Sequence, residues 1–86
     1  MDYALVTFAS TYGAIRAQEA LRPAVKAVTM PVLREISLGC GIALRLAPGD
    51  LGLARTVLAA CGLEPGEYAF YAVTGSGPAL RAERLE

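Results

Sequence analysis

Residues 42–61, IALRLAPGDLGLARTVLAAC, change their apolar period midway, and this change decides the fold class. Residues 42–46 alternate, which predicts a strand with Ile42, Leu44 and Leu46 on one face and Ala43 and Arg45 on the other. A turn follows over residues 48–50, with Asp50 as the expected helix N-cap. The stretch therefore predicts a strand that leads directly into a helix.

The helix predicted from about Leu51 to Cys61 has one apolar stripe. Its members recur at the i, i+3, i+4, i+7 spacing of a buried helix face, and they are Ala54, Val57, Leu58 and Cys61. Gly62 follows at the position where a helix often ends in a left-handed residue, and Leu63 supplies the usual apolar contact after it.

The same signals occur on both sides of this stretch. Strands are predicted over Tyr3–Phe8, Val25–Thr29 and Tyr68–Val73, because each is rich in β-branched, aromatic or alternating apolar residues. A helix is predicted from Ser10 or Thr11, either of which can cap it, to Arg22, where Pro23 stops it. The expected order of elements is therefore βαββαβ.

This order predicts an α+β fold, a ferredoxin-like two-layer sandwich with a four-stranded antiparallel sheet and two helices on one face. Residues 1–74 would form this single domain. Residues 75–86 are expected to be a flexible C-terminal tail after a glycine-rich joint, and residues 85–86 resemble a cloning scar.

Composition narrows the classes of partner. The chain has 86 residues, of which 55% are hydrophobic, an excess that predicts a homodimer through the helix-free sheet face. Eight basic residues balance eight acidic residues, so the net charge is zero. Nucleic-acid binders usually carry a basic excess, and we expect no nucleic-acid partner.

The sequence also bears on the cellular location of the protein and on whether it binds a metal. A signal peptide and a membrane-spanning run are not recognisable, so we expect a cytoplasmic protein without a membrane partner. Two cysteines are too few for a disulfide scaffold and are expected to be reduced. The chain has no histidine, which excludes histidine-dependent triads and the commonest zinc sites, and we expect no metal.

Cys40 is the main candidate site residue. In the predicted topology its loop meets the start of the first helix at Ser10 and Thr11, where unpaired N–H groups and the helix dipole favour an anion. A thiolate is stabilised in such a place, and Arg34 in the same loop would add positive charge. Gly39 and Gly41 leave the backbone beside the sulfur uncovered.

Each cysteine also has a structural interpretation. Cys40 would then be a small apolar residue under a glycine-rich turn, and Cys61 a buried member of the helix stripe. Because the second helix ends at the same end of the sandwich as the Cys40 loop, Cys61 is alternatively a resolving thiol.

The sequence also resembles a known family. Residues 7–11, Ala14 and Glu19, and above all residues 31–44, PVLREISLGCGIAL, are similar to a small bacterial selenium/sulfur carrier-like family long filed as a domain of unknown function. The resemblance extends from Tyr3 to about Val73. It implies that sulfur or selenium is carried on Cys40 as a persulfide or selenopersulfide.

The resemblance implies a shared role around the thiol for the other residues of the motif, which are Arg34, Glu35, Ser37, Gly39 and Gly41. It implies donor and acceptor proteins as partners and requires no cofactor. The alternative is a dimeric ligand-binding or regulatory module in which Cys40 only packs. An enzyme with a cysteine nucleophile is less favoured than either, because no base is identifiable.

Overall fold

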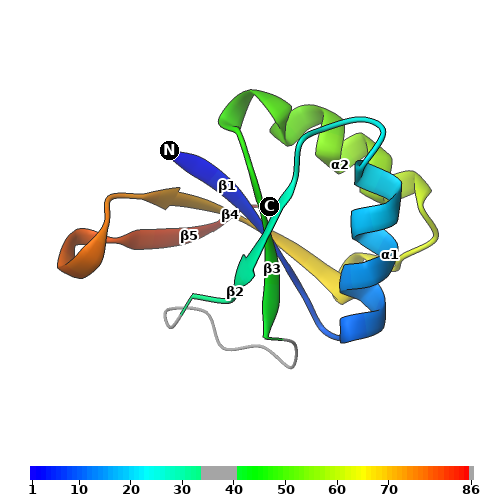
Figure 1. Ribbon diagram of the computed structural model, residues 1–86, viewed down its shortest axis with the longest axis horizontal. Coiled ribbons are helices and arrows are strands. Elements are labelled where there is room, and N and C mark those ends of the chain that lie inside the picture. The colour runs from blue at the N-terminus through cyan, green and yellow to red at the C-terminus, as the bar shows by residue number, and fades with distance from the viewer. Residues whose placement is uncertain (34–40, 86) are drawn as a thin grey trace.

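The computed structural model describes residues 1–33 and 41–85. One antiparallel sheet carries two helices on one of its faces (Figure 1). The elements, in chain order, are β1 (Tyr3–Phe8), α1 (Thr11–Leu21), β2 (Val28–Pro31), β3 (Ile42–Leu46), α2 (Leu51–Ala60), β4 (Tyr68–Thr74) and β5 (Arg81–Leu85), with short 3-10 turns η1 (Pro48–Asp50), η2 (Pro65–Glu67) and η3 (Gly77–Ala79).

The α+β class with two helices and an antiparallel sheet is as expected, but the predicted four-stranded ferredoxin-like sheet is wrong. The sheet has five strands in the order β2-β3-β1-β4-β5, and it is not the predicted four-stranded ferredoxin-like sheet. The additional strand comes from residues 75–86, for which we expected a flexible tail. β5 pairs with β4 over the register Phe70↔Leu85 to Thr74↔Arg81, so the hydrogen bonds of a neighbouring strand order a segment whose own side chains are largely charged.

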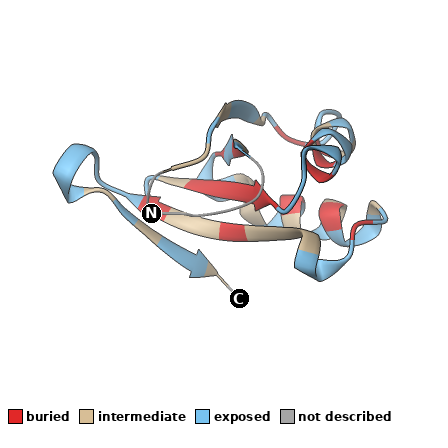
Figure 2. Cartoon of the chain, turned by 90° about the horizontal axis from the view of Figure 1, so that it is seen from below, coloured by how far each residue is buried: buried red, intermediate tan, exposed pale blue. Residues whose placement is uncertain are grey.

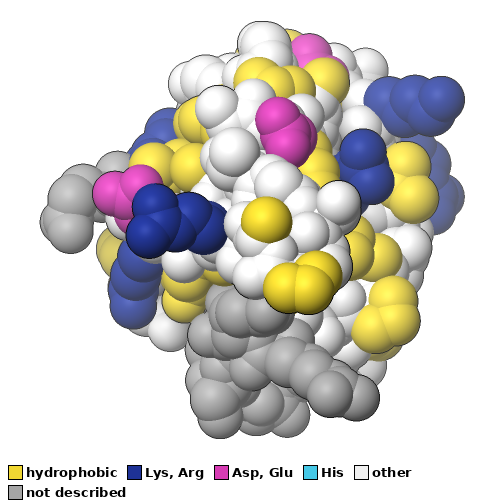
Figure 3. All heavy atoms as spheres, turned by 90° about the vertical axis from the view of Figure 1, so that its left-hand side faces the viewer, with side chains coloured by type: hydrophobic (Ala, Val, Ile, Leu, Met, Phe, Trp, Pro, Cys, Tyr) yellow, Lys and Arg dark blue, Asp and Glu magenta, His cyan; other side chains and the backbone are white. Residues whose placement is uncertain are grey.

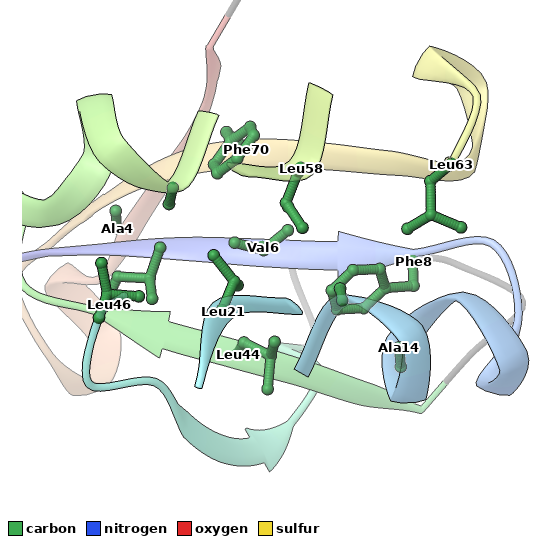
Figure 4. Close-up of a cluster of buried hydrophobic side chains, with 13 residues drawn as sticks. Ala4, Val6, Phe8, Ala14, Leu21, Leu44, Leu46, Leu58, Leu63 and Phe70 are labelled. Atoms are coloured by element: carbon green, nitrogen blue, oxygen red, sulfur yellow. The ribbon is translucent and has the colours of Figure 1, made fainter. Parts of the chain in front are cut away.

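The core between helices and sheet forms as the periodicity predicts. Val6, Leu44 and Phe70 project from β1, β3 and β4 toward Leu21 of α1 and Leu58 of α2 (Figure 4). All five are at most 4% exposed. Figure 2 shows the same pattern along the chain, with buried strand centres and an exposed tip on the β4–β5 hairpin.

The helix-free face of the sheet carries a second, smaller apolar cluster. Leu5, Ala43 and Val73 are each 0% exposed, and Tyr3 and Tyr71 are among the partly buried residues that pack against them. The centre of the helix-free face is therefore buried within the chain. Arg45 adds to its cover, because its Cζ lies 4.2 Å from the centre of the Tyr3 ring.

Two local predictions are also corrected. The second strand begins at Val28 and not at Val25, because the chain turns after α1 and the amide of Val25 donates to the Leu21 carbonyl. Asp50 occupies the N-cap position of α2 without a side-chain capping bond, since η1 continues directly into the helix and Asp50 is itself helical. Gly62 has the predicted left-handed conformation, with φ of +95°.

The β4–β5 hairpin depends on Gly75. Its φ is +79°, and a Cβ at this position would lie 2.5 Å from the carbonyl oxygen of Ala79. The amide of Gly75 also donates to the Asp2 carboxylate at 2.8 Å, which ties the hairpin to the start of β1.

We expect Gly75→Ala to lower the free energy of unfolding by about 2 kcal/mol or more, because the left-handed backbone alone costs an L-residue about 1–2 kcal/mol. Gly52→Ala is the matched control: Gly52 lies in α2 with open space around it. That change should stabilise the protein by up to about 1 kcal/mol. Urea denaturation measures both, and equal stability of the two variants would contradict the prediction.

Candidate functional site

The predicted site residues fall into two groups. Ser10, Thr11, Gly41 and Cys61 belong to the described part of the chain. The others, Arg34, Glu35, Ser37, Gly39 and Cys40, lie outside the described residues. The described residues that border this segment are Leu33 and Gly41.

The two ends of the segment that contains Cys40 lie close together. The amide of Val32, just after β2, donates to the carbonyl of Gly41, just before β3, at 3.0 Å. Val32 and Leu33 pack against the apolar cluster on the helix-free face of the sheet. The segment therefore starts and ends at the β2–β3 end of the sheet, beside that face.

Gly41 is exposed, and a Cβ added to it would meet nothing within 4 Å. The antiparallel register of β1 with β3 pairs Thr7 with Ala43, so the start of β3 lies at the end of β1, from which the chain enters α1. Gly41 therefore lies near the end of β1, while the predicted proximity of Cys40 to the α1 start concerns a residue outside the described ones and stays a prediction.

Ser10 serves as the N-cap of α1. Its Oγ accepts a hydrogen bond from the Gly13 amide at 3.1 Å, and its carbonyl accepts one from the Ala14 amide at 3.2 Å. Within the described part of the chain, the amides of Thr11 and Tyr12 remain the unpaired donors expected at a helix start. The Ser10 side chain is thus explained by capping, while the backbone beside it keeps two donors for an anion.

The end of α2 packs beside the start of α1. Leu63 and the Glu67 carbonyl border Gly13, and the Ala9 amide donates to that same carbonyl at 3.0 Å. The segment that follows α2 therefore meets the first turn of α1. Glu64 and Glu67 cap each other's backbone in η2, a role that accounts for both carboxylates.

Cys61 is half-buried at the C-cap of α2. Its thiol donates to the Leu58 carbonyl at 3.2 Å, and its own carbonyl accepts a hydrogen bond from Arg16 Nε at 3.3 Å. Ala54 and Leu58 of the predicted stripe are buried, whereas Val57 and Cys61 are partly buried at its margin. Through these contacts Cys61 links the end of α2 to α1.

The structure also contains a groove that the sequence did not indicate. Arg55 and Ala59 of α2, the start of β4 and the end of β5 border about 580 Å³ of open space. We call it the α2–β5 groove, and its other principal lining residues are Tyr68, Phe70, Arg84 and Leu85. The sequence signal for β5, the strand on one side of this groove, is the alternation of residues 81–85 (RAERL). This segment is short and carries three charges.

Two further findings concern metal binding and membrane-spanning helices. Among residues 1–33 and 41–85 there is no group of three cysteine, aspartate or glutamate side chains that could hold a metal ion. In the same residues, no helix is long and apolar enough to cross a membrane. On the face shown in Figure 3, basic side chains lie scattered among acidic and apolar ones.

Comparison with known proteins identifies the family. Residues 3–69 match the family described as "Putative Se/S carrier protein-like". No curated protein and no solved structure is significantly similar to the chain. The matched region contains β1 to the start of β4, both helices, and all the predicted site residues, and it ends before β5. The chain therefore belongs to the Se/S carrier protein-like family.

Proposed function

We propose that this protein carries sulfur or selenium on Cys40, as a persulfide or a selenopersulfide. The observation that carries the proposal is the position of Gly41, which is bonded directly to Cys40 and is exposed at the end of the sheet where α1 begins. Family membership over residues 3–69 supports the same chemistry, because the family is described as "Putative Se/S carrier protein-like".

The proposed loading step is a thiolate exchange. The Cys40 thiolate attacks the terminal sulfur of a donor persulfide, the S–S bond of the donor breaks, and the donor leaves as a thiolate. Cys40 then holds the terminal sulfur, and an acceptor nucleophile removes it in a second exchange of the same kind. Neither step changes the total number of electrons, so no further oxidant or reductant is needed.

The surrounding residues have defined parts in this proposal. The free amides of Thr11 and Tyr12 and the guanidinium of Arg34 stabilise the thiolate, because helix N-termini and arginines lower a thiol pKa. Gly39 and Gly41 leave room for the donor's sulfur. The side chains of Glu35 and Ser37 lie in the same motif and are proposed to shape the loop. Cys61 is a candidate resolving thiol: its thiolate would attack the Cys40 sulfur, the bond from that sulfur to the carried atom would break, and the atom would leave as hydrosulfide or hydroselenide while a Cys40–Cys61 disulfide forms.

The first test is the pH dependence of Cys40 alkylation in the Cys61→Ser variant, which leaves one thiol. We expect the rate to reach its plateau well below pH ~8.5, the usual thiol pKa, because only the thiolate reacts and a depressed pKa produces it at lower pH. Mass spectrometry of the iodoacetamide product measures the rate. A normal titration, or resistance to labelling in the folded state, would favour the alternative of a ligand-binding module with an unreactive Cys40.

The second test is loading itself. After exposure to glutathione persulfide, the wild type and Cys61→Ser should gain one sulfur atom on Cys40, while Cys40→Ser should gain none on that residue. Peptide mass spectrometry locates the sulfur. Loading of Cys61 alone would overturn the proposal. Release of hydrosulfide from the loaded wild type with formation of a Cys40–Cys61 disulfide, while loaded Cys61→Ser keeps its sulfur, would support the resolving role.

The homodimer stays a prediction. The central residues of the helix-free face are already buried within the chain, but Val28 at its margin is 49% exposed and pairs with Arg45, whose side chain lies on that face. We expect sedimentation velocity at micromolar concentration to detect a dimer that Val28→Lys weakens. Leu53→Lys is the matched control, because Leu53 is 48% exposed on α2. A wild type that sediments as a monomer would contradict the prediction.

A further inference from the structure

β5 covers the outer edge of β4 and forms the last strand of the sheet (Figure 1). The two strands pair from Phe70↔Leu85 to Thr74↔Arg81. The family match ends at residue 69, so it includes only the start of β4 and none of β5. β5 is therefore an addition to the region by which the family is recognised.

The side chains of β5 contribute little to the two apolar clusters. Its three charged side chains are exposed, and they belong to Arg81, Glu83 and Arg84. Leu85 is partly buried at the margin of the main core, and Ala82 is partly buried against the cluster on the helix-free face. By contrast, residues 4–8 of β1 are each at most 1% exposed. Because buried apolar contacts set the local stability of an element, β5 is held mainly by its backbone ladder with β4.

One side-chain hydrogen bond ties the turn before β5 to the rest of the sheet. The Asp2 amide donates to the Val73 carbonyl at 2.8 Å, which fixes the backbone of Asp2 beside β4. Its carboxylate then accepts a hydrogen bond from the Gly75 amide at 2.8 Å. The tip of the hairpin beyond this bond is exposed (Figure 2). The Asp2 carboxylate therefore holds the turn in the conformation that returns the chain along β4.

We propose that β5 is a releasable strap, which leaves β4 as a unit while β1 to β4 stay paired, and that the Asp2–Gly75 hydrogen bond keeps it closed. Release exposes the unpaired backbone N–H and C=O groups of the outer β4 edge, the kind of edge to which an extended segment of another protein adds as a strand. In the closed state β5 occupies this edge and blocks such pairing. The device is separate from the carrier proposal, because β4 and β3 flank β1 on opposite sides.

The test is hydrogen exchange of the full-length wild type, followed residue by residue by NMR at increasing urea concentration. After correction for intrinsic rates, we expect the amides that close the β4–β5 ladder to exchange at least about a hundredfold faster than those of β1. Their exchange should also depend less on urea, because release of one strand exposes less surface than global unfolding does. Equal rates with equal urea dependence would overturn the proposal, since the sheet would then open as one unit.

Asp2→Ala tests the hydrogen bond that closes the strap. We expect this change to raise the exchange rate of the β4–β5 ladder about tenfold, the size expected for the loss of one hydrogen bond to a charged group. Asp50→Ala is the matched control, because it removes the same side chain from a residue that makes no side-chain capping bond. The control should leave the ladder rates within about twofold of the wild type. Ladder rates unchanged by Asp2→Ala would contradict the closing role of Asp2.

Discussion

The two-sided burial of β1 is the constraint on which the rest of the structure depends. Residues 4–8 are each at most 1% exposed, because β3 and β4 flank the strand, the helices cover one face and the smaller apolar cluster covers the other. Thr7 is the single polar residue among them, and its hydroxyl donates to the Ala69 carbonyl at 3.5 Å. A strand buried on both faces permits no slip in register.

This register positions the candidate carrier site. Pairing of Thr7 with Ala43 brings the start of β3, and with it Gly41, to the end of β1. The chain leaves β1 at that end, passes Ser10 and starts α1, while the Ala9 amide bonds to Glu67 after α2. The sheet register therefore assembles one end of the molecule from segments that are far apart in the sequence. Family membership gives this end its proposed chemistry.

The two edge strands of the sheet, β2 and β5, differ in character. The β2 edge is short and ends at Pro31, which has no amide to offer another strand. β5 forms the other edge and carries Arg81, Glu83 and Arg84, which discourage edge-to-edge association. Because β5 lies beside β4, it also closes the α2–β5 groove next to Arg55 and Phe70.

The sequence by itself determined the elements whose signal is local. The alternation of residues 42–46, the stripe that contains Leu58 and the left-handed position of Gly62 each depend on residues close in the chain, and the structure contains all three. The motif around Cys40 was likewise enough to identify the family. Only the tertiary structure decided that residues 81–85 form a strand, that Val25 lies buried in a turn and not in a strand, and that α2, β4 and β5 together border a groove. The physical reason is that the hydrogen bonds and apolar contacts responsible for these features come from β4, β1 and α2, and a pattern of neighbouring residues does not contain them.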